Sequence, residues 1–116
     1  GANIAFGMGA LGLNPILIAA VGKDWADYDA WLTRHGVDTS HVRISQHLYT
    51  ATFMVTTDEK LNQIASFFPG AMSEARNIEL KPIMDKVGKL DLLVISPDDP
   101  EALPIGSRPN AGWFHP

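Results

Sequence analysis

The 116-residue chain contains no cysteine, no run of basic residues and no long hydrophobic segment. Without cysteine it forms no disulfide and has no thiolate chemistry, which is compatible with the cytoplasm, where we expect the protein to reside. A formal net charge of −4 and scattered lysines and arginines argue against a surface that binds nucleic acid. The apolar run 16–21 is far shorter than the roughly 20 residues needed to cross a membrane. We therefore expect neither nucleic acid nor a membrane among the partners.

The composition that remains is that of an ordinary globular protein. Hydrophobic residues make up 46% of the chain and charged residues 19%, which argues against a disordered segment. A chain of this length fits one small domain or a piece of a larger one. The four histidines lack the spacing of a metal site, so no metal ligand is expected among them.

Two continuous apolar runs predict buried strands of a parallel sheet. Residues 16–21 read Ile-Leu-Ile-Ala-Ala-Val, and residues 90–95 read Leu-Asp-Leu-Leu-Val-Ile. Such runs are typical of strands that are covered on both faces. A small-residue helix is expected over 3–13. Its interior glycines each cost about 0.5–1 kcal/mol relative to alanine, which is tolerable if the helix packs tightly against a sheet.

A second helix is expected after the first strand. Trp25, Tyr28 and Leu32 recur at helical spacing, and Asp24 is placed to cap the helix that carries them. The alternation of strand and helix predicts an α/β fold. Trp25 and Trp31, both on this helix, are expected to fill a core or an interface rather than to bind a base.

The middle of the chain predicts a β-hairpin. Residues 50–57 are rich in β-branched side chains, 58–60 form a polar turn, and 62–68 provide the return strand. The hairpin has few apolar partners within the chain. We therefore expect it to cover a ligand, another subunit, or both.

Residues 96–100, Ser-Pro-Asp-Asp-Pro, end the second apolar run at the edge where α/β proteins commonly bind ligands. Asp98 and Asp99 have the chemistry of a Mg²⁺ site, but the flanking prolines favour a solvated turn. Beyond them, the prolines and glycines of residues 103–116 predict an irregular tail of uncertain origin.

The opening Gly1-Ala2-Asn3-Ile4-Ala5, followed by Gly12 and Gly22, carries the first functional indication. Glycine lets a backbone approach a ligand, and an amide side chain donates and accepts hydrogen bonds at once, as a polyol edge requires. The structural alternative is that Asn3 only caps a helix. The spacing resembles the first signature of the PfkB (ribokinase-like) family of sugar and nucleoside kinases, and this sequence starts inside that signature.

Three further stretches resemble actinobacterial adenosine kinases within that family: residues 22–28, 50–58 and, most specifically, 63–77 (Gln-Ile-Ala-Ser-Phe-Phe-Pro-Gly-Ala-Met-Ser-Glu-Ala-Arg-Asn). The resemblance implies a partial ribokinase-like α/β fold, with buried parallel strands, helices and a small β lid hairpin. Residues 1–36 and 71–102 would belong to the large α/β domain and residues 37–70 to the lid.

The same resemblance implies which residues bind substrate. Asn3 would bind substrate hydroxyls, and Phe53 and Phe67 would flank a purine ring or wall a sugar pocket. The alternative for each phenylalanine is a place in the lid core or in a homodimer contact, which such lids tend to supply.

The family's catalytic Asp-Thr-x-Gly-Ala-Gly-Asp motif does not occur in this chain, so no catalytic, cofactor-binding or metal-binding residue is expected here. A bare G-x-G-x-x-G pattern at 7–12 follows no visible strand and is weak as a dinucleotide site. ATP and Mg²⁺ would be bound mainly by parts outside this sequence.

Two hypotheses follow. In the first, the chain is the N-terminal segment of an ATP-dependent kinase that transfers the γ-phosphoryl group to a hydroxymethyl group of adenosine or a sugar. In the second, it is a catalytically inactive kinase-like module that binds a ligand or dimerises through its hairpin. The anion-binding motif elsewhere in the gene distinguishes the two, and light scattering reports whether the hairpin self-associates.

Overall fold

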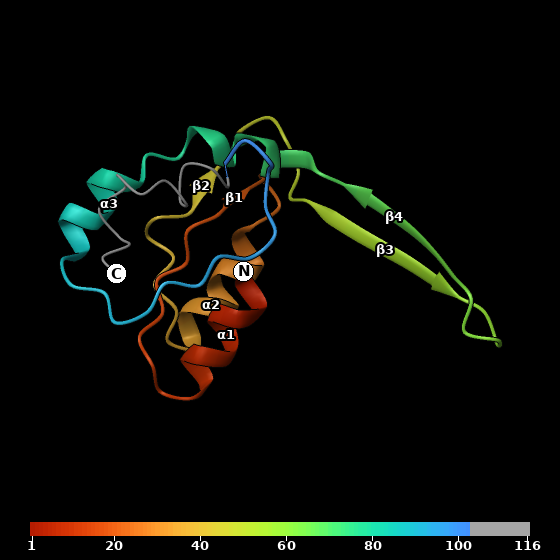
Figure 1. Ribbon diagram of the computed structural model, residues 1–116, viewed down its shortest axis with the longest axis horizontal. Helices are drawn as coiled ribbons and strands as arrows, with labels where there is room; N and C mark the ends of the chain where they lie inside the picture. Colours follow the sequence, from red (N-terminus) through yellow and green to blue (C-terminus); the bar gives the residue numbers. More distant parts are fainter. Residues whose placement is uncertain (103–116) are drawn as a thin grey trace.

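The computed structural model describes residues 1–102, which form short helices and strands with one long projecting hairpin (Figure 1). None of the helices in this part of the chain is long and apolar enough to span a membrane. The elements are α1 (Ala2–Ala10), β1 (Ala20–Val21), α2 (Ala26–Arg34), β2 (Arg43–Ile44), β3 (Thr52–Thr57), β4 (Gln63–Phe68), the 3₁₀ helix η1 (Gly70–Asn77) and α3 (Leu80–Val87). The tail expected over 103–116 lies outside the described residues.

A parallel strand pair joined through α2 organises the α/β part. β1 pairs with β2 in the register Ala20↔Arg43 and Val21↔Ile44, and an isolated parallel bridge joins Ile16 to Asp38. The predicted strand over 16–21 is therefore correct in place and direction, but it is regular only at its end. Strand, helix and parallel strand follow each other here, as the alternating pattern predicted.

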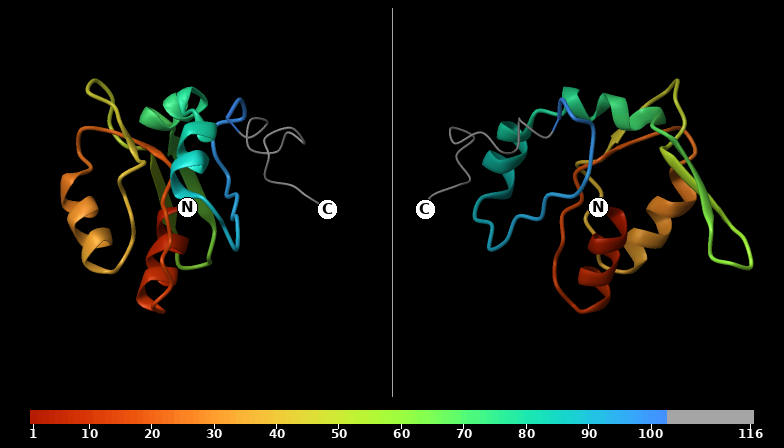
Figure 2. Two further views of the ribbon diagram at one scale, coloured as in Figure 1. Left: turned by 90° about the vertical axis from the view of Figure 1, so that its left-hand side faces the viewer. Right: turned by 45° about the vertical axis from the view of Figure 1, so that its right-hand side comes forward.

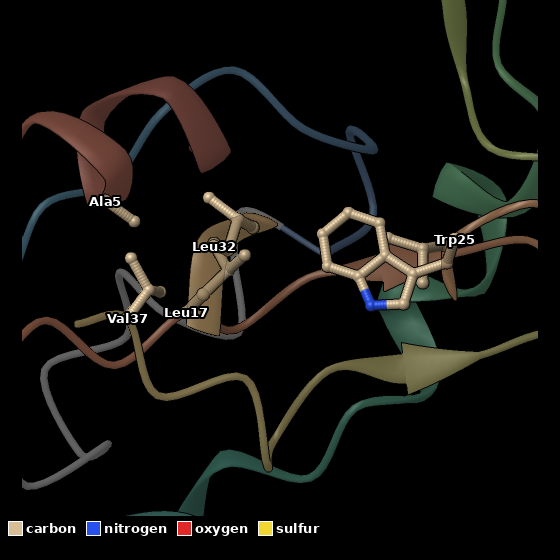
Figure 3. Packing of buried hydrophobic residues seen from close by; sticks show 6 residues of the cluster. Ala5, Leu17, Trp25, Leu32 and Val37 are labelled. Atoms are coloured by element: carbon tan, nitrogen blue, oxygen red, sulfur yellow. The ribbon is translucent and has the colours of Figure 1, made fainter. Parts of the chain in front are cut away.

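The hydrophobic core lies between α1, α2 and the two parallel segments (Figure 3). Trp25 and Leu32 are two helical turns apart and enter it from the same face of the α2 region. The buried members of the cluster are Ala5, Leu17, Val21, Trp25, Leu32 and Val37. The prediction of a core place is confirmed for Trp25. Trp31 is 43% exposed and stacks on Phe6, so its place in a core or an interface stays a prediction.

The prediction of a second buried strand over 90–95 is wrong. This run is irregular, and Leu92 to Ile95 are between 37% and 67% exposed. A parallel strand obtains its backbone hydrogen bonds from a neighbouring strand. Within residues 1–102, the parallel sheet contains only β1 and β2, and the run 90–95 pairs with neither of them.

The predicted hairpin is present and stands away from the rest of the molecule (Figure 2). β3 and β4 pair antiparallel over six residue pairs, from Thr52↔Phe68 to Thr57↔Gln63, and all their residues are exposed. At the tip, Asp58 Oδ1 accepts hydrogen bonds from the backbone N–H groups of Lys60 and Asn62. Asp38 and β2, which belong to the lid in the predicted division, pair instead with Ile16 and β1. The division into a lid of 37–70 and a large domain stays a prediction.

Thr50 attaches the hairpin to the α/β part. Its hydroxyl donates to Asp24 Oδ1 (2.7 Å) and accepts from the backbone N–H of Gly22 (3.0 Å), while its own N–H donates to Asp24 Oδ1 (2.9 Å). The prediction that Asp24 caps α2 is therefore wrong, because its carboxylate accepts hydrogen bonds from Thr50 and the N-cap residue is Trp25. A Cβ at Gly22 would overlap the Tyr49–Thr50 backbone, so only glycine allows this approach.

Two glycines of α1 differ in their surroundings. A Cβ on Gly9 would overlap the backbone carbonyl oxygen of His35, just after α2, whereas a Cβ on Gly7 would meet nothing within 4 Å. The sequence predicts that this helix packs tightly against a sheet. At Gly9 its close contact is instead with the backbone just after α2.

We predict opposite effects from the same substitution at these two positions. Gly9→Ala should destabilise the protein by about 1–3 kcal/mol, because the methyl group displaces the α2 carboxyl end. Gly7→Ala should stabilise it by about 0.5–1 kcal/mol through helix propensity. Denaturation of both variants measures the effects, and equal stabilisation by the two would contradict the close approach.

A second prediction concerns the titration of Asp24. Hydrogen bonds from the Thr50 hydroxyl and then the Thr50 N–H lower the pKa of Asp24 below its ordinary value of 3.8. Because the pKa is lower in the folded state, this contact stabilises the hairpin base above about pH 4 and is lost as the pH falls through the lowered pKa. Thr50→Ala should raise the carboxyl pKa toward 3.8 in an NMR titration. Thr56→Ala, on the exposed hairpin, is the control and should leave it unchanged.

Candidate functional site

A cleft of about 340 Å³ opens where the start of α1, the β1 segment, the hairpin base and residues 96–98 converge. Its polar lining includes Asn3, Tyr28, Thr50, Ser96 and Asp98, and its apolar lining includes Leu17, Val21 and Trp25. Polar groups from four separate segments thus meet above the hydrophobic core. A mixed lining of this kind suits a small molecule with hydroxyl groups and an apolar face.

Asn3 lies in the first turn of α1, on the cleft wall. The N-cap residue is Gly1 without a side-chain cap, so the alternative of Asn3 as a helix cap is wrong. The Tyr28 hydroxyl donates to Asn3 Oδ1 at 3.1 Å. This bond orients the amide and leaves its Nδ2 group to donate to a bound molecule. The role of Asn3 in binding substrate stays a prediction.

Asp98 lies on the wall formed by residues 96–98. Burial raises the pKa of its carboxyl group above the ordinary value of 3.8, and the neighbouring charge of Asp99 raises it further. One carboxyl oxygen accepts the N–H of Asp99 at 2.8 Å, which partly opposes the increase. Asp98 is thus a half-buried carboxyl group on a cleft wall, not a solvated turn residue, and is a candidate for ligand binding.

Asp99 corrects the same sequence interpretation more strongly. It is only 4% exposed, and its two carboxylate oxygens accept hydrogen bonds from Arg76 at 2.7 and 2.9 Å. Arg76 also lies 2.8 Å from the carboxylate of Glu101. The acidic pair therefore divides into a buried anchor, Asp99, and a cleft residue, Asp98. The flanking prolines gave no indication of this, because the partner is 23 residues away in the sequence.

Phe53 and Phe67 lie directly opposite each other across the hairpin, on one face. They are 64% and 55% exposed and line no part of the cleft. The structure therefore brings the two phenylalanines together but keeps them apart from Asn3. The hairpin base, Thr50 and Ala51, does line the cleft. Whether the aromatic pair flanks a base stays a prediction.

The glycine-rich pattern near the start of the chain does not form a phosphate-binding loop. The G-x-G-x-x-G pattern at 7–12 lies mostly inside α1, whose N–H groups bond within the helix or its final turn. A loop that binds phosphate needs such groups free and converging. No group of three acidic or histidine side chains within residues 1–102 is arranged to hold a metal ion.

Tyr28 and Thr50 are cleft residues that sequence reasoning did not identify, and Asp98 is one that it assigned to a solvated turn. Tyr28 was assigned only to the periodic face of α2. Thr50 was assigned only to a strand. For Asp98 a signal existed, since it follows an apolar run at the edge where α/β proteins bind ligands.

Solved structures with a similar backbone include two nucleoside kinases. The nucleoside kinase of Burkholderia thailandensis, solved in complex with inosine, is 27% identical over 87% of this chain, with a TM-score of 0.74. The nucleoside kinase of Methanocaldococcus jannaschii, an archaeal member of the ribokinase family, is 31% identical over 66% of the chain, with a TM-score of 0.62. A Cryptococcus neoformans ribokinase solved with ADP is 25% identical over 62%, with a TM-score of 0.57.

The chain spans 32%, 26% and 22% of these three proteins, respectively. Over that share, the similarity confirms the predicted ribokinase-like α/β fold with parallel strands and a small antiparallel hairpin. The sequence comparison extends further along this chain, because residues 1–110 match the profile of the pfkB family of carbohydrate kinases. The chain therefore belongs to the PfkB family.

Proposed function

We propose that this chain supplies the acceptor side of an ATP-dependent kinase that phosphorylates a hydroxymethyl group of a nucleoside, with a purine nucleoside such as adenosine as the first choice and a free sugar as the second. Two of the relatives above are nucleoside kinases, one of them bound to inosine, which favours the nucleoside. The third is a ribokinase, which supports a free sugar as the second choice of acceptor. The alternative of an inactive kinase-like module gains no support from these relatives.

The observation that carries the proposal is the polar cleft at Asn3. The amide is oriented by Tyr28, and Ser96 and Asp98 contribute hydroxyl and carboxyl groups to the lining. Together these groups donate and accept hydrogen bonds, as the hydroxyls of a ribose require. The apolar floor formed by Leu17 and Val21 excludes water from one side of such a ligand.

Phosphoryl transfer rests on positioning and on electrostatic stabilisation of the transferring group, usually with Mg²⁺. The G-x-G-x-x-G pattern lies mostly inside α1 and the catalytic motif of the family does not occur in this sequence, so we assign acceptor binding to this chain rather than the transfer step. We expect ATP and Mg²⁺ to be bound by other parts of the complete protein.

The hairpin is proposed to cover the acceptor and to contact a second copy of the protein. It carries apolar side chains on both faces, and all its residues are exposed. A two-stranded ribbon of this kind is at best marginally stable alone, so a covering ligand or partner would contribute to its stability.

The test is a phosphorylation assay on the complete protein with ATP and Mg²⁺. We expect transfer to adenosine or inosine with higher kcat/KM than to ribose or fructose. Higher kcat/KM for a free sugar would replace the nucleoside with the sugar as acceptor. Absence of transfer to every one of these acceptors would refute the proposed function.

The aromatic pair gives a separate prediction. If Phe53 stacks on the base, Phe53→Ala removes a contact worth about 1–3 kcal/mol and should raise the KM for adenosine about tenfold or more. Met54→Ala is the matched control, because Met54 is similarly exposed (68% against 64%) but points to the opposite face. Equal KM values for the two variants would remove Phe53 from the acceptor site.

A further inference from the structure

Three ion pairs extend from η1: Glu74 pairs with Arg43, and Arg76 pairs with Asp99 and with the more exposed Glu101. Glu74 pairs with Arg43 of β2 at 3.2 Å and accepts a hydrogen bond from the buried Ser45 hydroxyl. Arg76 pairs with Asp99, directly after the residues that line the cleft. The first pair joins η1 to the parallel strands. The second joins η1 to the cleft wall formed by residues 96–98.

The Arg76–Asp99 pair has the geometry of a strong contact. The guanidinium donates through Nε and Nη2 to the two oxygens of one carboxylate, a planar bidentate arrangement that lysine cannot reproduce. The Asp99 side chain is 6% exposed, whereas that of Glu74 is 25% exposed. A carboxylate this buried is costly without its partner, so Asp99 depends on Arg76.

Little else fixes the wall. The run 89–98 has no regular secondary structure, and Leu92 to Ile95 are exposed. The backbone N–H of Ala102 donates to the Asp99 carbonyl oxygen and closes the turn that follows. The bidentate pair therefore anchors the C-terminal side of the segment whose residues Ser96 and Asp98 line the cleft.

We propose that Arg76 is a positioning residue for acceptor binding: through Asp99 it sets the Ser96–Asp98 wall, from which the Asp98 carboxyl group hydrogen-bonds a hydroxyl of the acceptor. This inference rests on the proposed function and deepens it. One Asp98 oxygen is occupied by the Asp99 N–H, and the other is the group offered to the ligand. A carboxyl oxygen accepts a hydrogen bond from a ligand hydroxyl in either protonation state.

The experiment compares Arg76→Gln with Arg43→Gln in the complete protein. Arg76→Gln removes the pairs with Asp99 and with the exposed Glu101, and Arg43→Gln removes the pair with Glu74. We expect Arg76→Gln to raise the KM for adenosine about tenfold with a smaller change in kcat. Arg43→Gln should leave KM within about twofold, since a more exposed pair contributes little. Arg76→Lys keeps the charge but not the fork, and its KM should lie between those of the wild type and Arg76→Gln.

A double-mutant cycle tests the path through the wall. Asp98→Asn should raise KM by itself but add little in the Arg76→Gln background, because both act on one contact. Fully additive effects would overturn the proposal. The proposal would also be overturned if Arg76→Gln and Arg43→Gln changed KM equally and in proportion to their loss of melting temperature. Such a result indicates a purely structural role.

Hydrogen exchange separates this inference from the proposed function. Arg76→Gln should accelerate amide exchange at residues 92–99, and Arg43→Gln should not; unchanged exchange in Arg76→Gln would refute the positioning role. If the wild type phosphorylates no acceptor, the proposed function fails, and so does the role of Asp98 in acceptor binding. Amide hydrogen exchange still tests whether Arg76 anchors the cleft wall. If Arg76→Gln does not fold, Arg76→Lys serves in the same comparison.

Discussion

The contact of Thr50 with Gly22 and Asp24 is the constraint on which the arrangement of the molecule depends. Its hydroxyl and N–H join the end of the parallel β1 segment to the start of the hairpin, and the same residue lines the cleft. The approach is possible because Gly22 has no side chain. The α/β core, the projecting ribbon and the candidate site therefore meet at one residue. Any change in the angle of the hairpin must act through a junction that also forms the cleft.

The 3₁₀ helix η1 holds the opposite side of this junction. It follows the hairpin directly, and the Ala71 N–H donates to the carbonyl oxygen of Tyr49, one residue before Thr50. Its two charged side chains extend in different directions, Glu74 to β2 and Arg76 to the segment after residue 95. A 3₁₀ helix of eight residues is long for its kind and has poor internal hydrogen bonds. We infer that these side-chain contacts, rather than local propensity, account for its place in the fold.

Sequence reasoning recovered the features that depend on neighbours along the chain. The spacing of Trp25 and Leu32 predicted the core face of α2, and the β-branched run after Thr50 predicted the hairpin. It failed where the outcome depends on a distant partner. The run 90–95 has the composition of a strand but pairs with no strand among the described residues, and Asp24 has the position of a helix cap but bonds to Thr50, 26 residues on. Asp99 likewise gains its role from Arg76. Local patterns report what a segment is able to form, and tertiary contacts decide between the possibilities.

The site follows the same rule. The sequence proposed Asn3, Phe53 and Phe67 together, whereas the structure pairs the two phenylalanines on the hairpin and places Asn3 alone in the cleft. A nucleoside has a polar ribose and a planar base, and these two halves need unlike surroundings. Under the proposed function, the cleft at Asn3 suits the ribose, while the Phe53–Phe67 pair, exposed on the ribbon, suits the base or a second copy of the protein. One ligand touches both only if the hairpin inclines toward the cleft. The ribbon is attached through Thr50, which also lines the cleft. The hydrogen bonds of Thr50 therefore determine both the position of the hairpin and the specificity of the acceptor site.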